Sequence, residues 1–143
     1  MADRTLYTGG TFDLLHYGHL CFLKHCKHIA DRVVVSLNTD EFVSRYKDGS
    51  SVLSYAERYR GLVACGHVDL VVPNVGGEDS RPAIISVNPD IIAIGDDWAQ
   101  KDYYEQMGFT PSWLEDNEIV LVYIPYTKGI STSSIKARII DLG

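Results

Sequence analysis

The sequence predicts an α/β domain with a parallel sheet of about five strands and helices on both faces. Short apolar runs rich in β-branched residues alternate along the chain with stretches of helical spacing. These runs do not alternate with polar residues, which is the pattern of strands buried on both faces. Repeated β-α units of this kind build parallel sheets with right-handed crossovers.

Strands and helices alternate along most of the chain. Strands are expected at Leu6–Thr8, Val33–Leu37, Val68–Val72, Ile91–Ile94 and Ile119–Ile124. Helices are expected at His19–Ala30, Tyr55–Cys65, Arg81–Val87 and Thr132–Ile140. No repeat or low-complexity linker interrupts this order, and 143 residues suffice for one full core. We therefore expect residues 1–143 to form a single domain.

Composition excludes several classes of partner. Thirteen Lys and Arg residues against nineteen Asp and Glu give a net charge of -6, which disfavours binding to nucleic acids or to a membrane surface. The longest apolar run, Ile119–Ile124, is far shorter than the ~20 residues that span a bilayer. Three cysteines without an export signal suggest reduced thiols, so a cytoplasmic location is expected. A nucleotide substrate stays compatible, because helix N-termini bind phosphate even in acidic proteins.

Polar and glycine-rich segments directly follow four of the expected strands. In open parallel sheets, ligands bind beyond the carboxyl ends of the strands, so these segments are the candidate site. They are residues 9–19, 38–40, 95–98 and 126–132.

The first of these segments carries the most specific pattern. Gly9 and Gly10 end a strand, and His16, Gly18 and His19 open a helix. Residues three apart share one helix face, so both imidazoles can point at one site beside the free N–H groups of the helix start. This arrangement suits a polyphosphate. The alternatives are a capping and a surface histidine, or a zinc site, although zinc-binding helices favour H-x-x-x-H.

The segment GTFDLLHYGH at residues 10–19 resembles the signature of the HxGH nucleotidyltransferases. Together with Thr39–Phe42, Gly95–Trp98 and Gly129–Thr132, it resembles the cytidylyltransferase branch, most closely the bacterial glycerol-3-phosphate cytidylyltransferases. The resemblance runs from Thr5 to about Ile139 and implies a Rossmann-like fold.

The resemblance also implies a reaction. CTP and sn-glycerol 3-phosphate would give CDP-glycerol, a precursor of envelope or capsule polymers such as teichoic acid, and pyrophosphate by direct in-line attack. Mg²⁺ would be the cofactor, and the protein would be a homodimer. Alternatives are a phosphocholine or phosphoethanolamine cytidylyltransferase, an adenylyltransferase for FMN or a sugar phosphate, and a non-catalytic nucleotide-binding module.

The resemblance implies site residues as well. The catalytic residues would be His16, His19 and Lys47. The nucleotide would contact Gly10, Thr11, Phe12, His16, Gly18, His19, Asp97, Thr127, Lys128, Gly129, Ile130, Ser131 and Thr132. The acceptor would contact Lys47, Arg58, Arg81 and Trp98. The adjacent acids Asp96 and Asp97 at a strand end can hold Mg²⁺ or accept from the base or ribose, and no residue is assigned as a metal ligand.

Some of these residues have other readings. Lys47 can be an exposed loop lysine, in which case Arg45 would take its role at the phosphates. Arg58 can be structural, because it follows a capping box at the helix start. Asp97 can be a helix N-cap. At Tyr126 the family pattern has an arginine that binds triphosphate, and Lys128 is the expected substitute cation.

Overall fold

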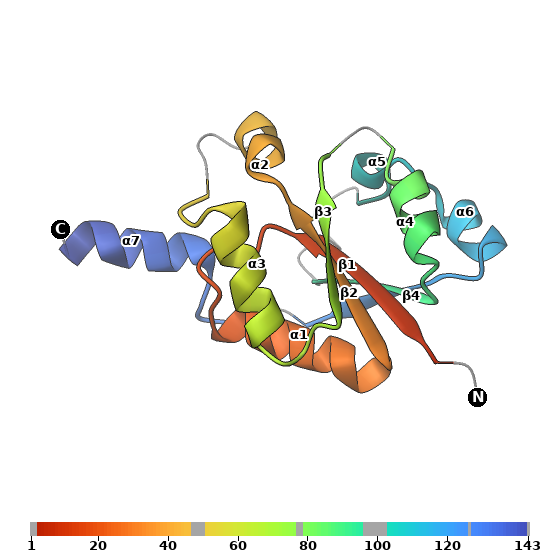
Figure 1. The fold of residues 1–143 in the computed structure, drawn as a ribbon, viewed down its shortest axis with the longest axis horizontal. Helices are drawn as coiled ribbons and strands as arrows, with labels where there is room; N and C mark the ends of the chain where they lie inside the picture. The colour runs from red at the N-terminus through yellow and green to blue at the C-terminus, as the bar shows by residue number, and fades with distance from the viewer. Residues whose placement is uncertain (1–2, 47–50, 77–78, 96–102, 126, 143) are drawn as a thin grey trace.

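The predicted parallel sheet of five strands is confirmed. The computed structural model describes residues 3–46, 51–76, 79–95, 103–125 and 127–142. The strand order is β3-β2-β1-β4-β5, with every neighbouring pair parallel (Figure 1). The strands are β1 (Thr5–Gly10), β2 (Arg32–Asn38), β3 (Leu70–Asn74), β4 (Ile91–Gly95) and β5 (Val120–Ile124).

Helices connect the strands, and more of them form than the sequence pattern predicts. The four expected helices are present, within a few residues at their ends, as α1 (Tyr17–Ile29), α3 (Tyr55–Ala64), α4 (Arg81–Val87) and α7 (Thr132–Leu142). The additional ones are α2 (Asp40–Tyr46), α5 (Tyr103–Met107) and α6 (Pro111–Asp116). These three span two turns or fewer, too short for an apolar period to stand out.

Each face of the sheet has its own apolar core. On one face, β1, β2 and β4 contribute alternate residues that pack against Leu23 and Cys26 of α1 and Leu62 of α3. On the other face, Ile84 of α4 and Leu114 of α6 pack against the intervening residues of β1 and β4, together with α5. The alternation arises because successive strand residues point to opposite faces.

Helix α7 stands apart from both cores. Figure 1 shows it extending away from the sheet toward the C-terminus. None of its residues is buried, and its first two turns are the part that lies near the sheet ends. Within the described part of the chain, no helix is both long enough and apolar enough to cross a membrane.

The sheet opens between β1, its middle strand, and β4. The register of β1 and β4 pairs Leu6 with Ile91 and Tyr7 with Ile92, and both strands continue beyond this pairing. Past that point Thr8 crosses the gap, where its hydroxyl donates to the carbonyl oxygen of Ala93 at 2.8 Å. The chain winds from β1 toward β2 on one side and returns to β4 on the other. A ligand site is expected at this switch point.

Arg58 of α3 ties the strand ends together. Its side chain is fully buried, and its guanidinium donates to the carbonyl oxygens of Leu53, Thr11 and Asn38 at 2.8 to 3.1 Å. It also pairs with the carboxylate of Asp40 at 2.8 Å. The acceptor contact predicted for Arg58 does not match this arrangement, because these groups turn the guanidinium into the protein.

The structural role of Arg58 predicts a stability effect. Replacing it by alanine leaves buried carbonyl oxygens without donors, so Arg58→Ala should lower the free energy of unfolding by about 2–4 kcal/mol in urea titrations. Arg60→Ala on the same helix is the control, because Arg60 is exposed and should change stability by roughly 0.5 kcal/mol or less. Unchanged stability in Arg58→Ala with a raised Michaelis constant for the acceptor would instead support direct contact.

Candidate active site

A cleft of about 850 Å³ lies at the carboxyl ends of the strands. All five strands contribute to it where they end, and so do α1 and α7; we call it the strand-end cleft. Its lining includes Thr8, Gly10, Asn38, Asn74, Gly95 and Ile124 from the strand ends, and His16, His19, Ser131, Thr132 and Lys136 from the helices. The cleft therefore occupies the position that the strand-end segments predict.

His16 and His19 meet in this cleft as a stacked pair. Their ring centroids are 3.8 Å apart, with an angle of 23° between the planes. The N–H of Gly18 donates to Nδ1 of His16 at 3.0 Å, and the N–H of His16 donates to Nδ1 of His19 at 3.2 Å. The two side chains thus form a capping box at the start of α1. Capping, the structural alternative for these histidines, therefore coexists with a position in the cleft.

The capping contacts determine which ring nitrogen carries the proton. A neutral imidazole has one donor and one acceptor nitrogen. Because Nδ1 of each ring accepts from a backbone N–H, the proton of each neutral ring lies on Nε2. The stacked pair therefore offers two N–H donors, one on each Nε2, to a ligand.

The environment keeps both rings neutral in the free protein. Burial lowers the pKa of His16. Burial and the neighbouring His16 lower the pKa of His19 to about 4, against an opposing effect of Asp13. The causes are the cost of removing a charged ring from water and the repulsion between two charged rings in contact.

Two glycines fit the geometry of the histidine segment. A Cβ atom on Gly18 would lie 2.8 Å from Cε1 of His16, so a side chain here would displace the imidazole. A Cβ atom on Gly10 would lie 2.9 Å from the ring of Phe12. Phe12 itself has a φ angle of 51°, as does Leu14, which is rare for residues with side chains. The segment between β1 and α1 is therefore held in a strained conformation, as functional segments often are.

Asp13 links this segment to the residues that precede α3. It is 4% exposed, and its carboxylate accepts from the N–H groups of Val52 and Leu53 at 2.7 and 3.0 Å. Burial alone would raise the pKa of Asp13, but these donors and Lys136 outweigh it and hold the pKa below its usual value. The sequence analysis assigned Asp13 no role, because its partners lie some forty residues away.

A second polar chain crosses the ends of β1, β2 and β3. The amide of Asn38 donates to the hydroxyl of Thr11 at 2.9 Å and accepts from the amide of Asn74 at 3.0 Å. Asn74 in turn accepts from the N–H of Gly76. Because Asn38 is buried, its side chain bonds to protein groups and not to solvent, and these bonds fix the relative position of the strand ends.

The start of α7 forms the opposite wall. Ser131 and Ser134 cap the helix reciprocally, each hydroxyl accepting from the other residue's N–H at 3.0 Å. The hydroxyl of Thr132 donates to the carbonyl oxygen of Asp13 at 2.9 Å. The first N–H groups of a helix have no acceptor within it, so those of Thr132 and Ser133 are available to an anion. Two helix N-termini, those of α1 and α7, therefore meet at the cleft.

The structure brings most of the predicted nucleotide contacts together. Lining the cleft are Gly10, Thr11, Phe12, His16, Gly18, His19, Thr127, Ser131 and Thr132. Ile130 lies behind them, with its Cγ2 atom 3.3 Å from the Cβ position of Gly18. Lys128 and Gly129 are exposed and do not line the cleft. Lys47, Asp97, Trp98 and Tyr126 lie outside the described residues.

Arg81 lies near the cleft without lining it. Its guanidinium makes two 2.8 Å contacts with the carboxylate of Asp79, which does line the cleft. An anion bound there would have to compete with this carboxylate for Arg81.

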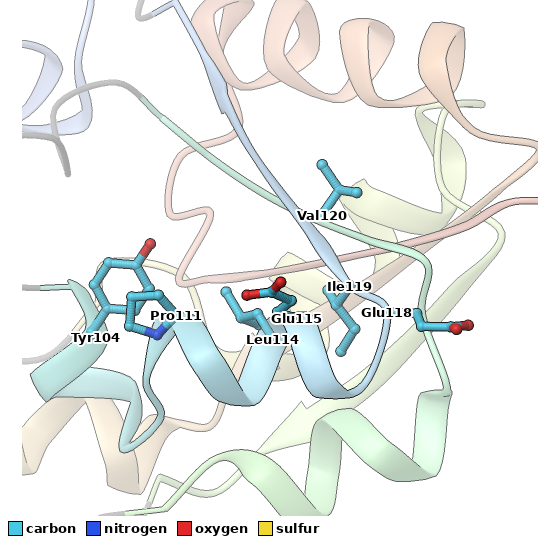
Figure 2. A pocket seen from close by; sticks show the side chains of 7 residues that line it. All are labelled: Tyr104, Pro111, Leu114, Glu115, Glu118, Ile119 and Val120. Atoms are coloured by element: carbon cyan, nitrogen blue, oxygen red, sulfur yellow. The ribbon is translucent and has the colours of Figure 1, made fainter.

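A second hollow of about 470 Å³ lies between α6 and β5 (Figure 2). Its described lining is mainly apolar, with the carboxylates of Glu115 and Glu118. None of the described residues that line it is basic, and carboxylates repel phosphate, so the strand-end cleft is the better site for a nucleotide.

Comparisons with known proteins identify the family and agree with the fold. The cytidylyltransferase-like family model matches residues 7–138. The glycerol-3-phosphate cytidylyltransferase of Bacillus subtilis (strain 168) is 37% identical over 139 residues, covering 97% of this chain and 99% of that protein. The enzyme of the same name from Staphylococcus aureus (strain NCTC 8325 / PS 47) is 32% identical, with 95% of both chains covered.

A solved structure shows a similar fold. The lipopolysaccharide core biosynthesis protein of Thermoplasma volcanium GSS1 superposes with a TM-score of 0.67 at 25% identity, covering 90% of this chain and all of that one. The family model spans the histidine pair, the strand-end cleft and most of α7, so the chain belongs to the cytidylyltransferase-like family.

Proposed function

We propose that this protein transfers the cytidylyl group of CTP to sn-glycerol 3-phosphate, giving CDP-glycerol and pyrophosphate. The observation that carries the proposal is the stacked pair His16 and His19, which lines the cleft while Nδ1 of each ring accepts from a backbone N–H. The acceptor is inferred from two relatives named glycerol-3-phosphate cytidylyltransferase that match over nearly their full length. These matches favour glycerol 3-phosphate over phosphocholine, phosphoethanolamine, FMN or a sugar phosphate.

The reaction is a direct displacement at the α-phosphorus of CTP. An oxygen of the glycerol 3-phosphate forms the new bond to this phosphorus, while the bond to the bridging oxygen of the β-phosphate breaks. The electron pair of that bond leaves with pyrophosphate. The attacking phosphate is already ionised at pH 7, so no residue has to remove a proton. Catalysis then depends on positioning and on stabilising charge.

The residues of the cleft supply these two effects. Nε2–H of His16 and His19 donates to phosphoryl oxygens whose negative charge grows in the transition state. The N–H groups at the start of α7 bind the same triphosphate from the other wall. The predicted contacts of Lys47, Asp97 and Trp98 remain part of the proposal, as does an acceptor contact by Arg81 once it leaves Asp79.

We also propose Mg²⁺ as the ion that accompanies CTP. Within the described residues no cluster of three or more His, Cys, Asp or Glu side chains could hold a metal. The described residues therefore do not form a resident metal site, and the ion would enter as the complex of CTP.

The proposed setting is a homodimer in the cytoplasm. The family resemblance supports the dimer, and the edge of the sheet offers apolar surface for it, with Tyr59, Val63 and Leu70 exposed on α3 and β3. The three cysteines are free, which suits a reducing compartment.

The proposed activity is tested by pyrophosphate release. Five nucleoside triphosphates are each combined with glycerol 3-phosphate, phosphocholine, phosphoethanolamine, FMN and a sugar phosphate, in the presence of Mg²⁺. Release is expected with CTP and glycerol 3-phosphate, with CDP-glycerol as the product. Turnover with another pair would overturn the substrate assignment. CTP binding without turnover on any acceptor would point to a non-catalytic module.

The histidine roles can be separated from capping by variants that keep the cap. Asparagine is a favoured N-cap residue and glutamine suits the third helical position, and both keep an acceptor for the cap but lack the stacked imidazole ring that fixes the position of Nε2. His16→Asn and His19→Gln should each lower turnover by about 10²–10³-fold with little change in melting temperature. His25→Gln is the control, because His25 is exposed on the same helix. A variant that retains more than about a third of wild-type turnover would contradict its catalytic role.

The lowered pKa of His19 predicts an acid effect on stability. The unfolded chain takes up a proton on this ring near the ordinary pKa of 6.5, whereas the folded protein does so only at about 4. The free energy of unfolding should therefore fall between pH 6.5 and pH 4, by about 3 kcal/mol at most for this group.

Urea titrations across this range check the expectation. His19→Gln should have a flatter profile between pH 6.5 and 4, while His25→Gln should follow the wild type. Below about pH 3.8 all three should lose the stabilisation that the ionised Asp13 provides, because the pKa of Asp13 is lowered. Parallel profiles of His19→Gln and wild type would show that His19 is not held neutral by its surroundings.

A further inference from the structure

We propose that Lys136 of α7 binds the triphosphate of the nucleotide, with Asp13 as the buried carboxylate that positions it. The proposal rests on the proposed function and adds a residue to it. Lys136 has no place among the contacts that the sequence resemblance implies.

The geometry places Lys136 on the cleft side of α7. It follows Thr132 by four residues, so the two side chains share one helix face. Both line the strand-end cleft. Both also contact Asp13, Thr132 through its hydroxyl at 2.9 Å and Lys136 through an Nζ–Oδ2 distance of 3.5 Å. The start of α7 is thereby fixed on the segment that carries the histidine pair.

The contact with Asp13 leaves hydrogen-bond donors of the Lys136 ammonium group available. The carboxylate already accepts two backbone N–H groups, one at 2.7 Å and one at 3.0 Å. The 3.5 Å separation from Lys136 is longer than the ~2.7–2.9 Å of a strong charge-assisted hydrogen bond. The Lys136 side chain is 40% exposed and belongs to the lining of the cleft, so a ligand in the cleft can reach it. Asp13 therefore holds the charge in place while leaving donors for an anion.

The balance of charge in the cleft needs such a group. Among the described residues that line it, the carboxylates of Asp13 and Asp79 face one permanently charged cation, Lys136. The histidines are neutral, Arg58 is bound to backbone carbonyls, and Lys128 does not reach the lining. The carboxylate of Asp79 is paired with Arg81, but without Lys136 the carboxylate of Asp13 would leave the described lining negative, and a triphosphate would be repelled. With it, a fixed positive charge stands beside the N-terminus of α7.

The test measures binding of CTP, cytidine and inorganic tripolyphosphate to the full chain by calorimetry. Lys136→Met keeps the aliphatic side chain and removes the charge, and Lys136→Arg restores the charge. The matched control is Arg138→Met, two residues on along the same helix, exposed and outside the cleft. Melting temperatures establish that each variant is folded.

Lys136→Met should lower the affinity for CTP and for tripolyphosphate by about 10-fold or more, and should change the affinity for cytidine by less than about 2-fold. Lys136→Arg should stay within about 3-fold of wild type, and Arg138→Met should match it. The Michaelis constant for the acceptor should not move. If the role of Lys136 is purely structural, Lys136→Met would instead lower the affinity for all three ligands together, or lower only the melting temperature.

The proposal is overturned if Lys136→Met keeps the wild-type affinity for tripolyphosphate. It is also overturned if the wild type binds no polyphosphate. An equal loss of cytidine and CTP affinity also overturns it. These outcomes are independent of turnover, because tripolyphosphate is bound without reaction. A wild type that binds CTP through Lys136 but makes no CDP-glycerol would refute the proposed activity and leave the assignment of Lys136 intact.

Discussion

Two backbone N–H groups at the start of α1, those of the N-cap residue His16 and of Gly18, govern the chemistry of the site. They donate to Nδ1 of His16 and His19, and an imidazole that accepts at Nδ1 carries its single neutral proton on Nε2. The helix start thereby selects the tautomer, fixes both ring planes and leaves a pair of donors. Asparagine and glutamine would satisfy the same N–H groups, so capping alone does not account for histidine at these positions. The position of the rings in the strand-end cleft does.

Buried polar contacts hold this arrangement where apolar packing is sparse. Arg58, Asn38 and Asp13 join segments that are far apart in the chain and meet at the strand ends. Such groups are costly to remove from water unless every donor and acceptor is matched. In the described part of the chain, no buried side-chain nitrogen or oxygen lacks a partner. The network therefore restricts the cleft to one geometry without adding to the apolar core.

The sequence allowed the sheet, its main helices and the histidine pair to be predicted, because each leaves a local pattern. Arg58 shows why other features could not be predicted. Its position after a capping box is visible, but the carbonyl oxygens it binds belong to residues 11, 38 and 53, which no local pattern relates. The motif predicts Lys128 as the cation, because Lys128 lies within it. Helical spacing from Thr132 points instead to Lys136, which lies outside the motif and lines the cleft.

The composition of the cleft also explains how a chain with a negative net charge can bind a triphosphate. Most of its donors are neutral, namely imidazole Nε2–H, helix N–H groups and hydroxyls, and the net charge of the chain is -6. A cluster of fixed cations would bind the ground-state triphosphate and the product pyrophosphate tightly. Such uniform binding does not raise turnover. Oriented neutral donors interact more strongly as charge accumulates on the oxygens they face, so their contribution is greatest in the transition state. Pairing the cation of the described lining with Asp13 follows the same principle, because the carboxylate moderates its attraction for the anion.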